Sequence, residues 1–218
     1  MTPMRAAALA ATLLVALTLP AAVAAQAEEE LAAAREGSEA FVEVAAAEAA
    51  GYGLPPEGPL HECVANLDGP GAMGLHYING DLVGDTELDP ATPEALVYEP
   101  TADGGLELVA VEYVVFAEAW DEANEMAPML FDEMFMLVEE PNRYELPAFY
   151  ALHAWIWREN ADGTFANFNP DVSCAAAMPN TALTEAPTEP PVAIVAVGAL
   201  ATLTAAAGIG LRVRRRSR

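Results

Sequence analysis

Hydrophobic and polar positions follow three patterns along this chain of 218 residues. Uncharged, mostly apolar runs lie near both ends, at residues 6–19 and 192–211. Residues 28–50 are rich in Ala and Glu, and Leu31 and Phe41 fall on a common helical face. From residue 61 onward, short apolar runs alternate with Gly, Pro, Asn and Asp, which is typical of strands joined by turns.

The middle of the chain predicts a single domain with a helix followed by a sheet. Residues 28–50 predict the helix, with a break at Gly37 and Ser38. The strongest strand patterns lie at residues 75–78, 95–98, 106–116 and 149–157. Asp103-Gly104-Gly105 is a tight-turn sequence, so the second and third strands are predicted to form an antiparallel hairpin. A helix followed by a mainly antiparallel sheet is an α+β fold, while residues 120–136 fit either a short helix or a loop.

The first apolar run predicts a secretory signal peptide over residues 1–27. Arg5 supplies a basic start, Pro20 ends the apolar run, and residues 22–27 contain two A-x-A cleavage patterns. The run is shorter than the roughly 20 apolar residues that a membrane-spanning helix needs. We therefore expect the segment to be removed, leaving residues 28–177 as an extracytoplasmic domain.

The last apolar run predicts one transmembrane helix over residues 192–211. A helix of this length reaches about 30 Å, which is the thickness of the hydrocarbon core of a bilayer. Five arginines follow within residues 212–218, and the positive-inside rule keeps such a tail in the cytoplasm. The acidic domain is therefore expected on the outer face of the membrane. The membrane is an expected partner, to which this single span would anchor the protein.

A short motif and spacer, residues 178–191, separate the domain from this span. The motif is Met178-Pro179-Asn180-Thr181-Ala182, followed by a segment rich in Thr, Pro and Glu. Motif, spacer, apolar span and basic tail together resemble the sorting signal of sortase-anchored surface proteins, commonly Leu-Pro-x-Thr-Gly. The resemblance implies cleavage after Thr181 by a sortase and attachment to the cell wall. Met178 and Ala182 depart from the common form, and a plain membrane anchor is the alternative.

The charge of the exported part narrows its range of partners. Residues 27–181 contain three arginines, no lysine and 31 acidic residues, a net charge of −28. Such a surface repels nucleic acid and attracts cations, so no nucleic-acid partner is expected. A general acidic bias of the source proteome is an alternative explanation for most of these charges.

The chain contains two cysteines, Cys63 and Cys174. In an exported protein an even number of cysteines predicts a disulfide, and two cysteines allow one intramolecular pairing. This bond would join the beginning of the folded core to its end. The alternative is a Cys/His metal site, which the absence of a Cys-x-x-Cys pair disfavours.

Three ionisable residues interrupt apolar strand patterns: His76, Glu112 and His153. Side chains alternate between the two faces of a strand, so His153 is expected to share a face with Trp155 and Trp157. A buried carboxylate is costly unless it is paired or bound to a metal. These positions are therefore candidates for a functional site.

Two histidines and a carboxylate are a usual ligand set for zinc or non-haem iron, and copper is a further choice. The same groups would suit acid–base catalysis with Glu112 as the base. A purely structural alternative has buried histidines and an ion pair between Glu112 and Arg143 or Arg158. The pattern alone does not distinguish these interpretations.

Two other clusters contain groups that bind cations. Methionine sulfur can bind Cu(I), although methionine more often fills gaps in a core. Oxygen-rich loops can bind Ca²⁺, although the spacing here is not that of an EF-hand. The methionines are Met126, Met129, Met134 and Met136, and the loop residues are Asn79, Asp81, Asp85 and Asp89.

Several segments of residues 40–174 resemble a family of uncharacterised exported bacterial proteins. They are Gly71-Ala72-Met73-Gly74-Leu75-His76-Tyr77-Ile78-Asn79, Val111-Glu112-Tyr113, Leu152-His153-Ala154-Trp155-Ile156-Trp157 and Asn169-Pro170-Asp171-Val172-Ser173-Cys174. The resemblance implies one domain and no particular reaction. Three functions stay open: a surface domain that binds a ligand or metal, a metal-dependent enzyme, and a structural or adhesive envelope protein.

Overall fold

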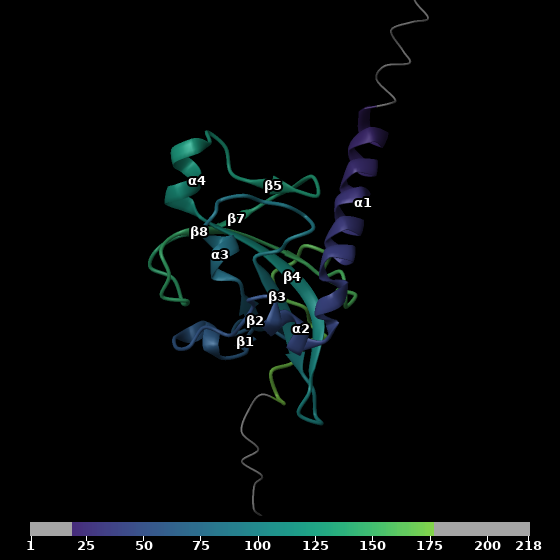
Figure 1. Cartoon of the computed structure of the whole chain (residues 1–218), viewed down its shortest axis with the longest axis vertical. Coiled ribbons are helices and arrows are strands. Elements are labelled where there is room, and N and C mark those ends of the chain that lie inside the picture. Colours follow the sequence, from purple (N-terminus) through teal and green to yellow (C-terminus); the bar gives the residue numbers. More distant parts are fainter. Residues whose placement is uncertain (1–18, 177–218) are drawn as a thin grey trace, which may run out of the picture. The chain divides into compact units, whose positions relative to one another are not determined.

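The computed structural model describes residues 19–176, whose arrangement is shown in Figure 1. Within this range no helix is both long enough and apolar enough to cross a bilayer. The predicted membrane span at 192–211, the basic tail and the sorting motif at 178–182 lie outside the described residues. So does most of the predicted signal peptide.

The helical part begins earlier than the sequence pattern predicted. Helix α1 (Leu19–Ser38) starts within the predicted signal peptide and continues past residue 28. It ends at the predicted break, where the Ser38 hydroxyl donates a hydrogen bond to the Ala34 carbonyl at 2.7 Å. A short 3₁₀ turn, η1 (Glu39–Val42), and helix α2 (Val44–Ala49) follow. Gly37 is required at the break because a Cβ there would overlap the backbone of Ala91.

A six-stranded antiparallel sheet forms the centre of the domain, in the order β1-β2-β3-β4-β8-β7 (Figure 1). Its strands are β1 (Val64–Ala65), β2 (Ala72–Ile78), β3 (Ala95–Pro100), β4 (Leu106–Phe116), β7 (Met136–Val138) and β8 (Phe149–Ala154). The remaining elements are η2 (Pro59–His61), α3 (Gly80–Val83), α4 (Ala117–Ala123) and the small pair β5 (Met129–Leu130) with β6 (Glu133–Met134). The predicted α+β class is confirmed for the described residues.

The predicted hairpin is confirmed between β3 and β4, which pair antiparallel with Leu96 opposite Val111. The turn between them closes with a hydrogen bond from the Thr101 amide to the Gly105 carbonyl at 2.9 Å. Gly104 has φ +85 and lies in open space, a conformation that glycine adopts without the cost of a Cβ. The turn chemistry of residues 103–105 was therefore a sufficient signal for this pair.

The last predicted strand is too long, because β8 ends at Ala154 and not at residue 157. Beyond it, the Trp155 amide donates to the Thr164 carbonyl, and the amides of Trp157 and Arg158 both donate to the Val109 carbonyl of β4, so the regular strand pairing ends. Trp157 consequently does not share the face of His153, as had been expected. Its indole packs against α1, where it donates to the Ser38 hydroxyl at 3.0 Å and lies beneath the Arg35 guanidinium.

The two faces of the sheet have different roles. One face packs against α1 and α2 and forms the main core, in which the tyrosines Tyr98 and Tyr113 are fully buried. Their hydroxyls donate to the carbonyls of Phe41 and Pro90 at 2.6 and 2.7 Å. Buried polar groups must find such partners, so this face is a closed structural core. The candidate site lies on the other face.

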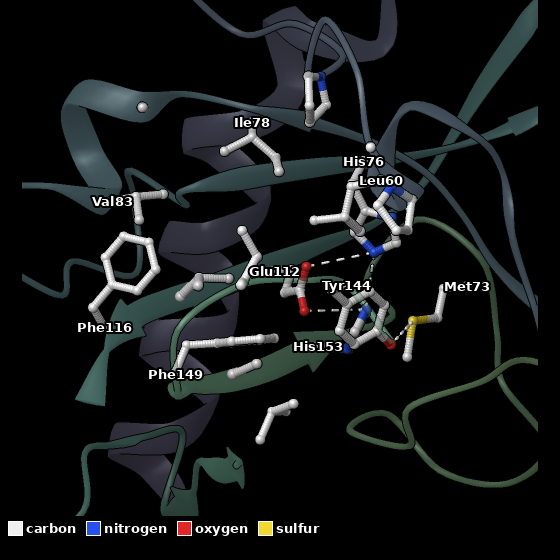
Figure 2. A pocket seen from close by; sticks show the side chains of 18 of the residues that line it. Leu60, Met73, His76, Ile78, Val83, Glu112, Phe116, Tyr144, Phe149 and His153 are labelled. Atoms are coloured by element: carbon white, nitrogen blue, oxygen red, sulfur yellow. Dashed lines mark hydrogen bonds and ion pairs between the residues drawn. The ribbon is translucent and has the colours of Figure 1, made fainter. Parts of the chain in front are cut away.

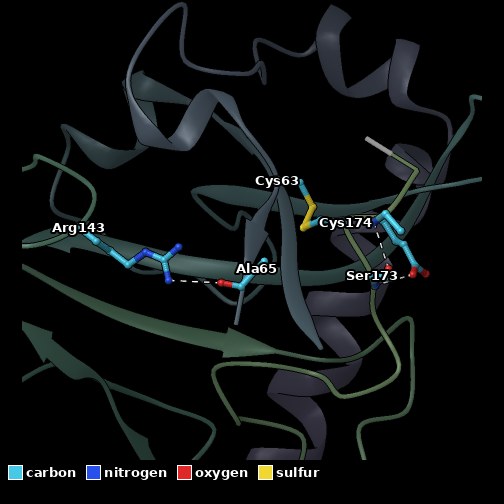
Figure 3. The surroundings of a disulfide bond; sticks show 7 residues. Cys63, Ala65, Arg143, Ser173 and Cys174 are labelled. Atoms are coloured by element: carbon cyan, nitrogen blue, oxygen red, sulfur yellow. Dashed lines mark hydrogen bonds between the residues drawn. A yellow bond between two sulfur atoms is a disulfide. The ribbon is translucent and has the colours of Figure 1, made fainter. Parts of the chain in front are cut away.

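The predicted disulfide is confirmed between Cys63 and Cys174, whose Cα atoms are 5.6 Å apart (Figure 3). It joins the segment before β1 to the end of the described chain. Next to it, Ala72 at the start of β2 forms an antiparallel bridge with Asn169. Gly71 precedes this bridge with φ +86, and a Cβ there would overlap the Asn169 carbonyl. The close approach of the two segments therefore depends on glycine at this position.

Candidate metal centre

The pairing of the strands brings the three predicted site residues to one face of the sheet. Glu112 on β4 lies directly opposite His153 on β8. His76 lies on β2, two strands away from β4, and is paired with Val97 on β3. Residues that are directly opposite in a sheet share a face. Glu112 is paired with Ala95 on β3, so all three site residues point to the same side.

Strand β3 lies between the strands that carry His76 and Glu112. Neighbouring strands lie about 4.8 Å apart, so β2 and β4 are separated by roughly 10 Å. The long side chains of His76 and Glu112 meet above β3, where Val97 lies opposite His76 and Ala95 lies opposite Glu112. Figure 2 shows both imidazoles turned toward the Glu112 carboxylate.

The three groups are separated by nearly equal distances. The Nε2 atoms of His76 and His153 lie 3.5 Å from the Oε2 and Oε1 atoms of Glu112, respectively. The same two Nε2 atoms are 3.5 Å from each other. Good hydrogen bonds to nitrogen have lengths of about 2.7 to 3.2 Å, so these contacts are poor hydrogen bonds. By contrast, two donors bound at about 2.1 Å to one tetrahedral ion are roughly 3.4 Å apart.

Burial controls the protonation of the cluster. The exposed fractions of His76, Glu112 and His153 are 2%, 8% and 3%. Burial lowers the pKa of His76 to about 4, an effect that the backbone of Gly74 partly opposes. Burial, followed by the neighbouring imidazole of His76, lowers the pKa of His153 to about 3. Both imidazoles are thus neutral near pH 7, as a metal ligand must be.

Glu112 is shifted in the opposite direction. Burial raises its pKa to about 8, and the negative charge of Glu94 adds to the effect. Without a bound cation, the carboxyl is therefore mostly protonated near neutral pH. A divalent cation would favour the ionised form, so binding would release a proton.

The environment holds the two histidines differently. The ring of His153 stacks on Trp155, with centroids 6.2 Å apart and an interplanar angle of 14°. The Nδ1 atom of His76 is buried and has no hydrogen-bond partner among the described residues. A metal-bound histidine usually donates its second N–H to a protein acceptor. The cluster meets this condition incompletely at His76.

A cavity of about 300 Å³ opens above the cluster (Figure 2). The three site residues contribute to its lining, together with Tyr144, whose hydroxyl lies 3.7 Å from the Met73 sulfur. Most of the other lining side chains are apolar. The candidate metal ligands are therefore reached from an apolar space.

The structural alternative of an arginine partner for Glu112 is wrong. Arg158 forms ion pairs with Glu99 at 3.0 Å and with Glu107 at 2.8 Å. Arg143 donates to the Ala65 carbonyl near the disulfide (Figure 3). Among the basic side chains of residues 19–176, Glu112 has only the two imidazoles within ion-pair distance.

The other two cation-binding candidates differ in how the structure uses their side chains. The four methionines do not fill core gaps, since their exposed fractions range from 44% to 78%. Met129 and Met134 are opposite each other on β5 and β6. In the acidic loop, Asn79 and Asp85 accept local backbone hydrogen bonds from Asp81 and Glu87. These side chains thus stabilise turns.

Two residues of interest were not identified in the sequence. Tyr144 lies in an irregular segment, where no periodicity indicated that it would reach the cavity. Glu94 is 1% exposed and accepts a hydrogen bond from the Val114 amide at 3.1 Å. It precedes β3 directly, and its position next to an apolar run was the only available signal.

Comparisons of the chain with protein-family models, with curated proteins and with solved structures found no match. The residues of the site are therefore the whole basis for an assignment. The resemblance to a family of exported bacterial proteins stays a prediction.

Proposed function

We propose that this domain binds one divalent transition-metal ion, with zinc the best fit, through His76, Glu112 and His153. The observation that carries the proposal is the separation of 3.5 Å between the donor atoms. This spacing is too long for good hydrogen bonds and close to that of donors around one ion.

The energetic cost of the cluster supports the same conclusion. Burial of Glu112 between two neutral imidazoles lowers stability near neutral pH, because its carboxyl must either be ionised without a partner or stay protonated above its ordinary pKa. No arginine or lysine among the described residues forms an ion pair with it. A bound cation would supply the compensation. Groups whose pKa values are strongly shifted by such an environment cluster at functional sites.

The test is elemental analysis of the full chain after loading with zinc and extensive dialysis. The wild-type protein is expected to retain about one equivalent, and His76→Ala and His153→Ala should retain far less. His61→Ala is the matched control, because His61 is the third histidine of the chain and is exposed. Wild-type protein that takes up neither zinc, iron nor copper would refute the proposal.

A second candidate function is metal-dependent catalysis. Three protein ligands leave a coordination position open, as in catalytic zinc sites, whereas structural zinc sites have four protein ligands. The cavity above the cluster would give a substrate access to that position. Loaded full-chain protein should then hydrolyse a simple activated ester faster than the Glu112→Gln variant. Equal rates of ester hydrolysis by the two proteins would refute hydrolysis as a function and leave metal binding as the proposed function.

The proposal includes an extracytoplasmic location with a membrane or cell-wall anchor. The disulfide supports it, because stable disulfides are rare in reducing compartments. If a sortase acts on the motif, wild-type protein should be found in the cell-wall fraction and Thr181→Ala in the membrane fraction. Identical fractionation of the two proteins would indicate a plain membrane anchor.

A further inference from the structure

We infer that the ligand completing the metal centre is a monoanion with a short apolar tail, such as a medium-chain carboxylate. The inference rests on the proposed metal centre and adds the chemical class of its ligand. It comes from the charge of the cluster and from the size and lining of the cavity above it.

The cavity lining is nearly all apolar. Its polar side chains are the three metal-ligand candidates, Tyr144 and the exposed Glu57. The wall around the cluster is formed by Val114, Phe116, Met136, Val138, Leu146 and Phe149. Phe116 and Phe149 are labelled beside the site in Figure 2. A polar ligand such as a sugar would leave its hydroxyls without partners against this wall, which is costly.

The charge of the loaded cluster selects the head group. Two neutral imidazoles, one carboxylate and a divalent ion have a net charge of +1. A buried net charge is unfavourable, so one negative charge at the open coordination position would be stabilised. No arginine of the described residues lines the cavity, and the chain has no lysine. Within the described part of the chain, a bound metal ion would consequently be the only cation that an anionic head group meets in the cavity.

The size of the cavity limits the tail. An apolar cavity of about 150 Å³ is enough for benzene, so about 300 Å³ has room for roughly ten carbon atoms. Burial of each methylene group strengthens binding about fourfold. The tail, rather than the head group, would thus supply most of the selectivity.

The experiment uses the full chain loaded with Co²⁺, whose visible absorption responds to a change of ligand. Acetate, butyrate, hexanoate and octanoate are titrated separately. The dissociation constant is expected to fall about fourfold per methylene group until the cavity is full. Octanol has the same tail without the charge and should leave the cobalt spectrum unchanged.

Ala151→Phe tests the cavity without altering a metal-ligand candidate. Ala151 lies on β8, is opposite Val114 and lines the cavity, so a phenyl ring there would occupy the space for the tail. The variant should bind cobalt as the wild type does, bind acetate equally, and bind octanoate at least tenfold more weakly. Val114→Phe fills the same space from β4 and replaces Ala151→Phe if that variant does not fold.

The outcomes separate the inference from the proposal on which it rests. Failure to bind any cobalt would refute the metal centre, and the inference with it. If the protein binds cobalt and the loaded protein then has equal affinity for acetate and octanoate, the apolar tail is refuted and the metal centre is not. Octanoate binding that is as strong in metal-free protein as in loaded protein would refute the role of the ion in head-group recognition.

Discussion

Replacing Glu112 with glutamine should stabilise the metal-free protein and abolish its stabilisation by zinc. A carboxyl group whose pKa is raised on folding favours the folded state only while it is protonated. That contribution is present below the unfolded-state pKa and is lost as the pH rises through the folded-state pKa. For Glu112 the window runs from the ordinary value of 4.5 to about 8.

The magnitude follows from these two pKa values. At pH 7.5 the unfolded carboxyl is ionised and the folded one is still largely protonated. Three pH units above 4.5 correspond to a penalty of about 4 kcal/mol, at about 1.4 kcal/mol per pKa unit. Glutamine removes this penalty but introduces amide donors, and an unpaired buried donor costs about 1–3 kcal/mol. The net gain for Glu112→Gln is therefore roughly 1–3 kcal/mol.

The assay is urea denaturation of the full chain, followed by tryptophan fluorescence, with chelator and with zinc. In chelator at pH 7.5 the variant should unfold at a higher urea concentration than the wild type, and the difference should shrink near pH 4.5. Zinc at about 100 times its Kd should stabilise the wild type by about 2.7 kcal/mol and leave the variant unchanged.

Glu107→Gln is the control, because Glu107 lies on the same strand but is exposed and pairs with Arg158. Glu107→Gln should change neither the urea midpoint in chelator nor the stabilisation by zinc appreciably, since exposed ion pairs contribute about 0–1 kcal/mol. A Glu112→Gln protein that is less stable than wild type in chelator at pH 7.5 would refute the reasoning. Equal stabilisation of both proteins by zinc would also do so.

Three further predictions concern the fold. Replacing Cys63 and Cys174 with alanine opens a loop of sequence separation 111 and should cost about 5 kcal/mol in urea unfolding; an unchanged midpoint would contradict this. Burial raises the pKa of Glu94 to about 8, so Glu94→Gln should stabilise the protein progressively from pH 4.5 to 8, by up to about 5 kcal/mol; a difference independent of pH would count against it. Gly71→Ala should cost at least about 2 kcal/mol more than Gly104→Ala, because both glycines have φ near +85 but only Gly71 is crowded by backbone; equal thermal melts would refute the importance of that close approach.

Local patterns were sufficient for much of the fold. The β-branched run at 106–116 and the turn at 103–105 predicted the β3–β4 hairpin, since side-chain alternation and turn chemistry act over a few residues. The two cysteines allowed one pairing, which the structure contains. The same alternation singled out Glu112 and the two histidines, because each stands where a strand usually has a hydrophobic residue. These features depend on neighbours in the sequence, so the sequence itself determined them.

Only the tertiary structure decided whether those three residues meet. His76 and Glu112 come from strands that are not adjacent, and their side chains meet because the strand order places both on one face across β3. Regular pairing of β8 ends at Ala154, where the Trp155 amide donates to the Thr164 carbonyl, a contact that no local pattern signals. The apolar cavity above the cluster, including Tyr144, likewise arises from segments far apart in the chain. The sequence supplied the donor groups, while strand order and packing set the 3.5 Å spacing that makes them a candidate metal centre.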